Sequence, residues 1–225
     1  MAPPKRSRPK PATPGASPRR LPQQERSRAR VRAILRAGRE LIGERGVDAV
    51  SVREIASRAE APIASVYQYF PNKSALVWAL VTEYVELYQP LLLEALGQAQ
   101  TPEDLAPALH EAIDGYLELF VEHPPMLNLW HAVRADPALR EYALAQAEQD
   151  AGLLGYALQR FFPRVDSREL EEAAGLAVAL VGSLVPHLRA APCETSARLM
   201  KELKRLVTLR VEALRRANDA NQCRA

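Results

Sequence analysis

Along most of the chain, apolar residues recur every three or four positions, and charged or polar residues fill the positions between them. This spacing is typical of amphipathic α-helices, whereas no stretch keeps the strict alternation that a half-buried β-strand needs. The hydrophobic pattern therefore predicts an all-α protein. Prolines and glycines divide the pattern into separate helices, whose ends are predicted to within about two to four residues.

The first patterned segment predicts a long helix followed by a short one. The long helix begins near residue 26 and ends at Gly46, because glycine readily adopts the left-handed backbone that terminates a helix. Ser51 then stands three residues before Glu54, a capping-box sequence in which each side chain accepts a hydrogen bond from the other residue's backbone amide. We expect the second helix to run from this box to about Ala59.

A second short helix and an exit helix follow at once. Pro62 suits the first turn of the third helix, where its missing N–H is not needed, and Pro71 ends that helix. Asn72 is a natural N-cap for the fourth helix. This fourth helix is predicted over residues 73–89 and is expected to stop at Pro90.

Beyond Pro90, five further amphipathic helices are predicted. Their expected ranges are 102–122, 125–134, 137–162, 167–189 and 193–218. Short connections between long amphipathic helices place neighbours antiparallel, so this part of the chain predicts a helical bundle. The expected organisation is a tail (1–24), a domain with the short helices (25–73), a linking helix and bundle (74–220) and a flexible C-terminus (221–225).

Charge is distributed unevenly along the 225 residues, whose net charge is +3. Residues 1–30 hold nine Lys or Arg and one Glu, and residues 31–73 hold seven basic and five acidic side chains, which leaves residues 74–225 with a net charge of −7. A basic N-terminal third before an acidic remainder favours contact between that third and a polyanion. A solvated basic tail with no partner is the other interpretation.

Composition also bears on the tail and on the compartment. Seven of the eighteen prolines lie in the first 22 residues, which contain almost no large apolar side chains, so residues 1–24 are expected to be disordered. The two cysteines show neither metal-ligand spacing nor a disulfide framework. No apolar leader is found, and the longest apolar run, residues 176–186, is shorter than the roughly 20 residues of a membrane span. We expect a soluble, cytoplasmic protein without a membrane partner.

The sequence gives little support for an enzyme. The four histidines form no HxxxH or HExxH pair, no glycine-rich phosphate loop occurs, and no Ser-His-Asp grouping can be argued. We expect no catalytic residue, no bound metal and no cofactor.

Two short helices joined by a tight turn form a helix-turn-helix unit, whose second helix can enter the major groove of DNA. If Val66 and Phe70 are the buried residues of that helix, its other side chains spread over the remaining surface. These are Ile63, Ala64, Ser65, Tyr67, Gln68 and Tyr69. A phenol there can reach a phosphate, and Lys73 adds a charge at the positive end of the next helix. The alternative is that Tyr67 and Tyr69 only close the top of a small core.

The sequence from residue 34 to residue 80 resembles the DNA-binding domain of the tetracycline-repressor-like (TetR/AcrR) transcriptional regulators. The matching motifs are Ile34-Leu35, Glu44-Arg45-Gly46, Val52-Arg53-Glu54-Ile55-Ala56, Val66-Tyr67-Gln68-Tyr69-Phe70 and Asn72-Lys73. The resemblance implies a repressor-type homodimer in which each subunit presents one helix-turn-helix to half of a near-palindromic operator in double-stranded DNA. It also implies a small-molecule effector that changes the separation of the two DNA-reading helices.

The resemblance further assigns roles to single positions. It implies that Arg53 reaches a base or a phosphate from the second helix. The implied groove-facing residues are Ile63, Ala64, Tyr67 and Gln68, and those that hold the DNA backbone are Ser65, Tyr69 and Lys73. Apolar side chains suit thymine methyl groups, and Gln68 suits adenine. Ile63 could equally belong to the core, because it lies three residues before Val66.

Two residues depart from the family pattern. Glu60 replaces the usual glycine of the turn, where a positive φ would cost a non-glycine residue about 1 kcal/mol. Pro62 replaces the usual serine cap. These departures favour a rival hypothesis, a helical protein-interaction module with a TetR-like fold that no longer binds DNA.

The last two predicted helices carry the features of a dimer interface. Gly175, Ala179 and Gly182 form a stripe without side-chain bulk, which lets another helix approach closely. The resemblance implies that these two helices form a four-helix interface between subunits. The expected contacts from the last helix are Leu199, Leu203 and Leu206. The alternative is that both stripes pack only within one subunit.

Aromatic residues at helical spacing occupy the other helices, and such a set is most often plain core. The resemblance implies that they line a pocket for a small, largely apolar effector of unknown identity. The candidate lining residues are Tyr84, Tyr88, Tyr116, Phe120, Trp130 and Tyr156. His131 and Arg134 are candidates to meet a polar or acidic end of the effector, unless both simply face water.

Overall fold

The computed structural model of the chain describes residues 23–222, and α-helices make up nearly all of that segment. The all-α prediction is confirmed. The described residues form α1 (Gln23–Arg45), α2 (Val52–Arg58), α3 (Ile63–Tyr69), α4 (Lys73–Gln98), α5 (Pro102–Glu122), α6 (Pro125–Ala135), α7 (Pro137–Phe161), α8 (Ser167–Ala190) and α9 (Cys193–Gln222). The predicted disordered tail, up to residue 22, and residues 223–225 lie outside the described segment.

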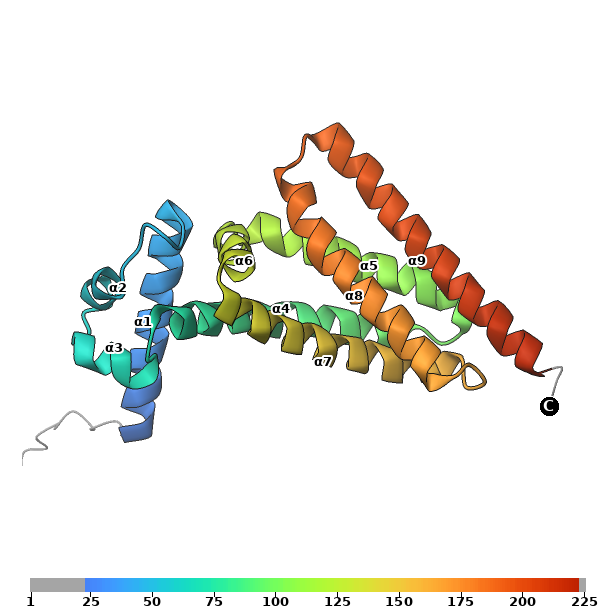
Figure 1. Ribbon diagram of the computed structural model, residues 1–225, viewed down its shortest axis with the longest axis horizontal. Coiled ribbons are helices and arrows are strands. Elements are labelled where there is room, and N and C mark those ends of the chain that lie inside the picture. Colours follow the sequence, from blue (N-terminus) through green and yellow to red (C-terminus); the bar gives the residue numbers. More distant parts are fainter. Residues whose placement is uncertain (1–22, 223–225) are drawn as a thin grey trace, which may run out of the picture.

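The helices form two groups joined by α4 (Figure 1). At one end of the molecule, α1, α2 and α3 lie together, and α4 leads from them along the larger group that contains α5 to α9. The arrangement is the one expected from the sequence, a three-helix domain, a linking helix and a helical bundle.

The three N-terminal helices share a core with the start of α4. Ile34 of α1, Ile55 of α2, Val66 of α3 and Leu76 of α4 are each fully buried. Burial of an aliphatic side chain of this size contributes about 1.5–3 kcal/mol. The burial of Val66 also sets the rotation of α3 about its axis, so the residues between the buried positions turn toward solvent.

Contacts from the bundle hold the end of α1 in place. Asn128 of α6 donates hydrogen bonds from Nδ2 to the backbone oxygens of Ile42, at 3.1 Å, and Gly43, at 3.4 Å. Arg39 of α1 forms an ion pair with Glu83 of α4. The N-terminal domain is therefore attached to the bundle at several points, and its orientation depends on α4 and α6 together.

One predicted boundary is wrong, because the fourth helix continues through Pro90 to Gln98. Pro90 is exposed, so its ring lies on the solvent side of α4. Beyond it, Ala95 and Leu96 are buried in a second core with residues of α5, α7 and α8. This packing offsets the cost of an interior proline, which is about 3 kcal/mol in an isolated helix.

Candidate nucleic-acid interface

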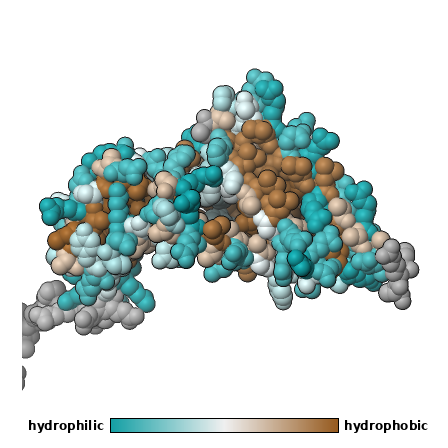
Figure 2. Space-filling model, viewed as in Figure 1, coloured by the Kyte–Doolittle hydropathy of each residue, from teal (hydrophilic) through white to brown (hydrophobic). Residues whose placement is uncertain are grey.

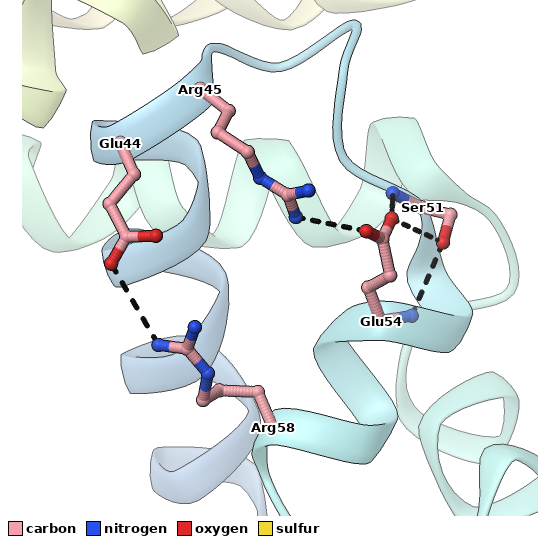
Figure 3. A network of polar contacts seen from close by, with 5 residues as sticks. All are labelled: Glu44, Arg45, Ser51, Glu54 and Arg58. Atoms are coloured by element: carbon pink, nitrogen blue, oxygen red, sulfur yellow. Dashed lines mark hydrogen bonds and ion pairs between the residues drawn. The ribbon is translucent and has the colours of Figure 1, made fainter.

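The capping box predicted at the start of α2 is present (Figure 3). The Ser51 hydroxyl accepts a hydrogen bond from the Glu54 amide at 3.2 Å, and the Glu54 carboxylate accepts one from the Ser51 amide at 2.8 Å. These bonds to Ser51, together with a 3.0 Å bond from Arg45, lower the pKa of Glu54 from 4.5 to about 2. The box determines where α2 begins and therefore which of its side chains point outward.

Ion pairs neutralise two arginines around α2 but not a third. Arg45 pairs with Glu54, and Arg58 pairs with Glu44 of α1 (Figure 3). Arg53 is exposed and forms no ion pair among residues 23–222. Its charge is therefore available to a partner outside the subunit.

The turn between α2 and α3 has the backbone of a Schellman motif. The amide of Glu60 donates to the oxygen of Ser57 at 3.2 Å, and the amide of Ala61 donates to the oxygen of Ala56 at 2.9 Å. Glu60 has a φ of 51°, the left-handed conformation that favours glycine. Glu60 therefore bears backbone strain of about 1 kcal/mol. Pro62, at the N-cap of α3, supplies no side-chain cap.

One side of α3 is buried and the other faces solvent. Val66 is fully buried, and Phe70, which follows the helix, is nearly so. The exposed residues are Ile63, Ala64, Tyr67 and Gln68. Tyr67 is 50% exposed and Ile63 is 37% exposed, so neither is a core residue. All four groove-facing residues implied by the resemblance thus lie on the solvent side of α3.

The remaining two predicted residues of α3 contact α1. The Tyr69 hydroxyl lies 2.9 Å from the hydroxyl of Ser27, and Arg30 lies 3.5 Å from the Ser65 hydroxyl. Both α3 residues are half-buried. Tyr69 therefore fits the alternative in which a tyrosine closes the small core, and Tyr67 does not.

Arg53, Tyr67 and Lys73 surround one open, concave surface. Lys73 is the first residue of α4 and forms no ion pair within the described part of the chain. Asn72 caps the same helix by accepting a hydrogen bond from the Ala75 amide at 2.7 Å. Two unpaired cations, a phenol and a helix N-terminus on one side of the domain are the groups that bind phosphate oxygens.

The bundle contains an apolar cavity of about 130 Å³ bordered by α4, α5, α7, α8 and α9. Two of the predicted effector residues, Tyr88 and Tyr116, line it, and their rings pack edge to face with centroids 5.3 Å apart. Asp150 of α7 also lines the cavity and is only 6% exposed. Sequence reasoning missed Asp150, because one acidic residue in a helix with charged neighbours carries no local sign that it is buried.

The other predicted effector residues do not line this cavity. Tyr84, Phe120 and Trp130 pack in or against the core that extends from the N-terminal domain. Tyr156 is 82% exposed, so it faces solvent and does not line the cavity. His131 and Arg134 are also exposed, which fits the alternative in which both face water. Spacing along a helix shows which aromatic residues share one side of it, but it does not show whether that side packs against another helix or faces solvent.

The outer side of α8 and α9 is apolar. Figure 2 shows an apolar area where these helices lie. Its large exposed residues are Leu176, Leu180, Leu199, Leu206 and Leu209. Leu203, which was expected at this surface, is 1% exposed and belongs to the core of the subunit. In the predicted glycine stripe, Gly175 and Gly182 are half-buried and Ala179 is exposed.

The segment 167–189 of α8 is long and apolar enough to cross a membrane by length and composition, and 28% of its apolar window is buried. Leucines on the outward side of α8, such as Leu176, contribute to this hydropathy. Core and interface helices of water-soluble proteins share this composition, so it does not by itself indicate a membrane.

Two family models match the chain. Residues 34–80 match the model of bacterial regulatory proteins of the tetR family, and residues 103–213 match that of the tetracyclin repressor-like C-terminal domain. The solved structure of a TetR-family transcriptional regulator from Streptomyces coelicolor is 30% identical, covers 81% of this chain and 99% of its own, and has a TM-score of 0.60. A putative transcriptional regulator from Pseudomonas aeruginosa PAO1 shares the fold at 20% identity, with coverage of 88% and 96% and a TM-score of 0.61.

A curated relative is similar over a shorter region. The transcriptional regulator AcuR of Cereibacter sphaeroides is 37% identical over 75 residues, which are 33% of this chain and 32% of AcuR. The chain thus matches about a third of the length of that relative.

The two domain matches and the Streptomyces coelicolor relative show that the chain belongs to the TetR family of transcriptional regulators. Members of this family bind DNA, usually form dimers and are generally not enzymes.

Proposed function

We propose that this protein is a cytoplasmic repressor that binds a near-palindromic operator as a homodimer and is released by a small, largely apolar effector. The observation that carries the proposal is the solvent-facing side of α3, where Tyr67 stands beside Arg53 and Lys73 around one concave surface. Neither cation has a carboxylate partner within residues 23–222, so both are available to phosphate oxygens.

The exposed side of α3 is suited to reading base edges. Ile63 and Ala64 offer apolar contact to thymine methyl groups, and Gln68 has the amide that pairs with adenine. Tyr67 reaches a phosphate or sugar at the edge of the groove. Ser65 and Tyr69 act mainly through α1, because both contact that helix.

A dimer explains the apolar outer side of α8 and α9. Two helix-turn-helix units that read one operator must lie about 34 Å apart or a multiple of that distance, which requires a rigid connection between subunits. Leu176, Leu180, Leu199 and Leu206 supply the apolar area for such a connection. The same contact would remove from water the part of α8 that has the composition of a membrane span.

The cavity in the bundle supports the effector part of the proposal. Tyr88 places α4 at the cavity, and α4 begins at Lys73 in the candidate DNA interface. A ligand that fills the cavity shifts α4 relative to α8, and this movement changes the distance between the two α3 helices of a dimer.

A footprint of the protein on the DNA upstream of its own coding region tests the proposal. We expect protection of two symmetric half-sites separated by whole helical turns, with an affinity that falls steeply as salt increases, because phosphate contacts release counterions. Absence of protection, or protection of one unpaired site, contradicts the proposal.

The rival is a protein-interaction module that keeps the fold and no longer binds DNA. It is favoured by Glu60, whose positive φ strains the turn before α3, and by the missing side-chain cap at Pro62. The footprint separates the two functions, since the rival predicts no half-sites.

A further inference from the structure

Asp150 is a buried carboxylate in the wall of the cavity, and three neutral side chains donate hydrogen bonds to it. The Tyr88 hydroxyl donates to Oδ2 at 2.5 Å, and the Nε2 atoms of Gln89 and Gln146 donate to Oδ1 at 2.8 and 3.0 Å. A carboxylate offers about four acceptor positions. Oδ1 is therefore saturated, whereas Oδ2, the oxygen bonded to Tyr88, keeps one acceptor position unused by the described side chains.

Among residues 23–222, no side chain of opposite charge balances Asp150. No Lys, Arg or His side chain of the described chain forms an ion pair with it. Burial of an ionised carboxylate without an opposite charge is costly, and hydrogen bonds from neutral donors recover only part of that cost. A cation that enters the cavity would gain the uncompensated attraction.

The phenols around Asp150 do not supply this missing charge. Burial raises the pKa of Tyr88 well above its ordinary value, and the hydrogen bond to Asp150 raises it further. Burial, followed by the charge of Asp150, also raises the pKa of Tyr116. Both phenols therefore stay protonated and neutral.

Aromatic rings next to a carboxylate form an environment that suits a cation. Tyr88 and Tyr116 stand in the same wall, and the electron-rich faces of such rings attract ammonium groups most strongly where water is excluded. The rest of the lining is largely aliphatic, with Leu92, Ile113 and Val181 among its residues. The cavity of about 130 Å³ is close to the roughly 150 Å³ of a protein cavity that accepts benzene.

We propose that the ligand of this cavity is a small organic cation, a protonated amine or a quaternary ammonium on a compact apolar body. The cationic group lies against Oδ2 of Asp150 and the Tyr88 and Tyr116 rings, and the apolar body fills the space toward α8. This inference rests on the proposed function in treating the cavity as the effector site, and it adds the sign of the ligand's charge. An organic anion of the same size is repelled by Asp150.

The test compares three probes that share one ring and differ in charge: benzylammonium, benzyl alcohol and benzoate. Binding to the full chain without DNA is measured by isothermal titration calorimetry near neutral pH and at low salt. We expect benzylammonium to bind about tenfold more tightly than benzyl alcohol, and benzoate to bind more weakly than either. This comparison within the wild-type protein does not depend on the folding of any variant.

A pair of variants on α7 then assigns the preference to one carboxylate. Asp150→Asn removes the buried charge with little change in shape, and we expect it to abolish the preference for benzylammonium while benzyl alcohol binding stays unchanged. Glu148→Gln removes a charge from an exposed position of the same helix and should leave the preference intact. Tyr88→Phe frees a second acceptor position on Oδ2, and this variant should also keep the preference for benzylammonium.

Equal binding of the three probes, tighter binding of benzoate, or no binding of any probe at millimolar concentration overturns the inference, since Asp150 would then be a structural carboxylate only. A preference that persists in Asp150→Asn also overturns it.

DNA release is measured separately. If a neutral ligand of the cavity releases DNA without charge preference, the inference fails and the proposed function stands. If benzylammonium binds through Asp150 and leaves DNA bound, the cation site stands and the effector part of the proposed function fails.

Discussion

The hydroxyl groups of Tyr69 and Ser27 lie 2.9 Å apart, so the last residue of α3 is joined to the N-terminal part of α1. Tyr67, two residues earlier, makes no side-chain hydrogen bond within residues 23–222 and is 50% exposed. The two phenols therefore differ in role. Tyr69 positions α3 on the domain, and Tyr67 is available to a partner.

Replacement of both Tyr67 and Lys73 by alanine should lower operator affinity about a hundredfold, because each lost hydrogen bond to a charged phosphate is worth about 1.5 kcal/mol. Fluorescence anisotropy with a labelled operator measures the affinity, and circular dichroism and sedimentation check that fold and dimer are intact. As a comparison, Tyr69→Phe should lower the free energy of unfolding by about 1 kcal/mol and reduce affinity much less. Unchanged operator affinity in the double variant would refute the role given to Tyr67 and Lys73.

Glu60→Gly should raise the free energy of unfolding by about 0.5–1 kcal/mol, because glycine adopts the left-handed backbone without strain. The matched control is Ala59→Gly, one residue earlier, where φ is −80° and the backbone is right-handed. That change should lower stability, because glycine gains conformational freedom in the unfolded chain and relieves no strain in the folded one. Urea unfolding measures the free energy of unfolding of both variants. A loss of stability in Glu60→Gly would show that the backbone at Glu60 is not strained.

Acid should weaken the N-terminal domain through Glu54. The hydrogen bonds to Ser51 and then Arg45 hold the pKa of Glu54 at about 2 in the folded chain, against an ordinary 4.5, so the unfolded chain binds more protons between these values. The stabilisation is complete above about pH 4.5 and is lost as the pH falls toward 2.

Urea unfolding near pH 6 and near pH 3 measures this effect. The loss of stability between the two conditions should be smaller in Glu54→Gln than in the wild type. Glu148→Gln, an exposed residue outside any ion pair of residues 23–222, should behave like the wild type. The same loss in Glu54→Gln and in the wild type would remove Glu54 as the cause.

Charge placed on the outer side of α8 and α9 should separate the subunits. Leu176 is 58% exposed and Leu206 is 51% exposed in the subunit, and the proposed dimer buries both. For the double variant Leu176→Glu and Leu206→Glu, sedimentation velocity should show a monomer where the wild type is a dimer. Operator affinity should fall as well, because a monomer binds only one half-site. Leu144→Glu, on α7 and 66% exposed, is the control that should remain dimeric. A wild-type monomer at micromolar concentration would exclude the dimer.

Gly43→Ala should disturb the contact between the N-terminal domain and the bundle. A Cβ atom at Gly43 would lie 2.7 Å from Cγ of Pro125 in α6, so α1 and α6 would have to move apart. We expect a lower unfolding temperature and weaker operator binding. Gly97→Ala, in the last turn of α4, adds a methyl group with nothing beyond its own stretch of helix within 4 Å, and should instead stabilise the chain by up to about 1 kcal/mol. If Gly43→Ala left the unfolding temperature and operator binding unchanged, the contact between α1 and α6 would not be tight.

Much of the candidate DNA interface could be predicted from sequence, because its signals lie within single turns of helix. The Ser51–Glu54 box and the Asn72 cap join residues three apart, and both are present in the structure. The spacing of Val66 and Phe70 favoured the solvent side of α3 for Tyr67, and its 50% exposure decides against the alternative of a core residue. The cavity in the bundle was predicted only in part, since Tyr88 and Tyr116 line it and Tyr156 does not.

The sequence by itself determined the helical class, most helix boundaries, the helix-turn-helix and its caps, since these depend on periodicity and on neighbours a few residues away. Only the tertiary structure decided that Tyr69 bonds to Ser27 across 42 positions, that Asp150 is buried against Tyr88 across 62, and that Leu203 faces inward. The tertiary structure also decided that α4 continues through Pro90, because packing against distant helices outweighs the tendency of proline to end a helix. Burial and charge balance depend on residues that meet only after folding, and spacing along one helix does not specify them.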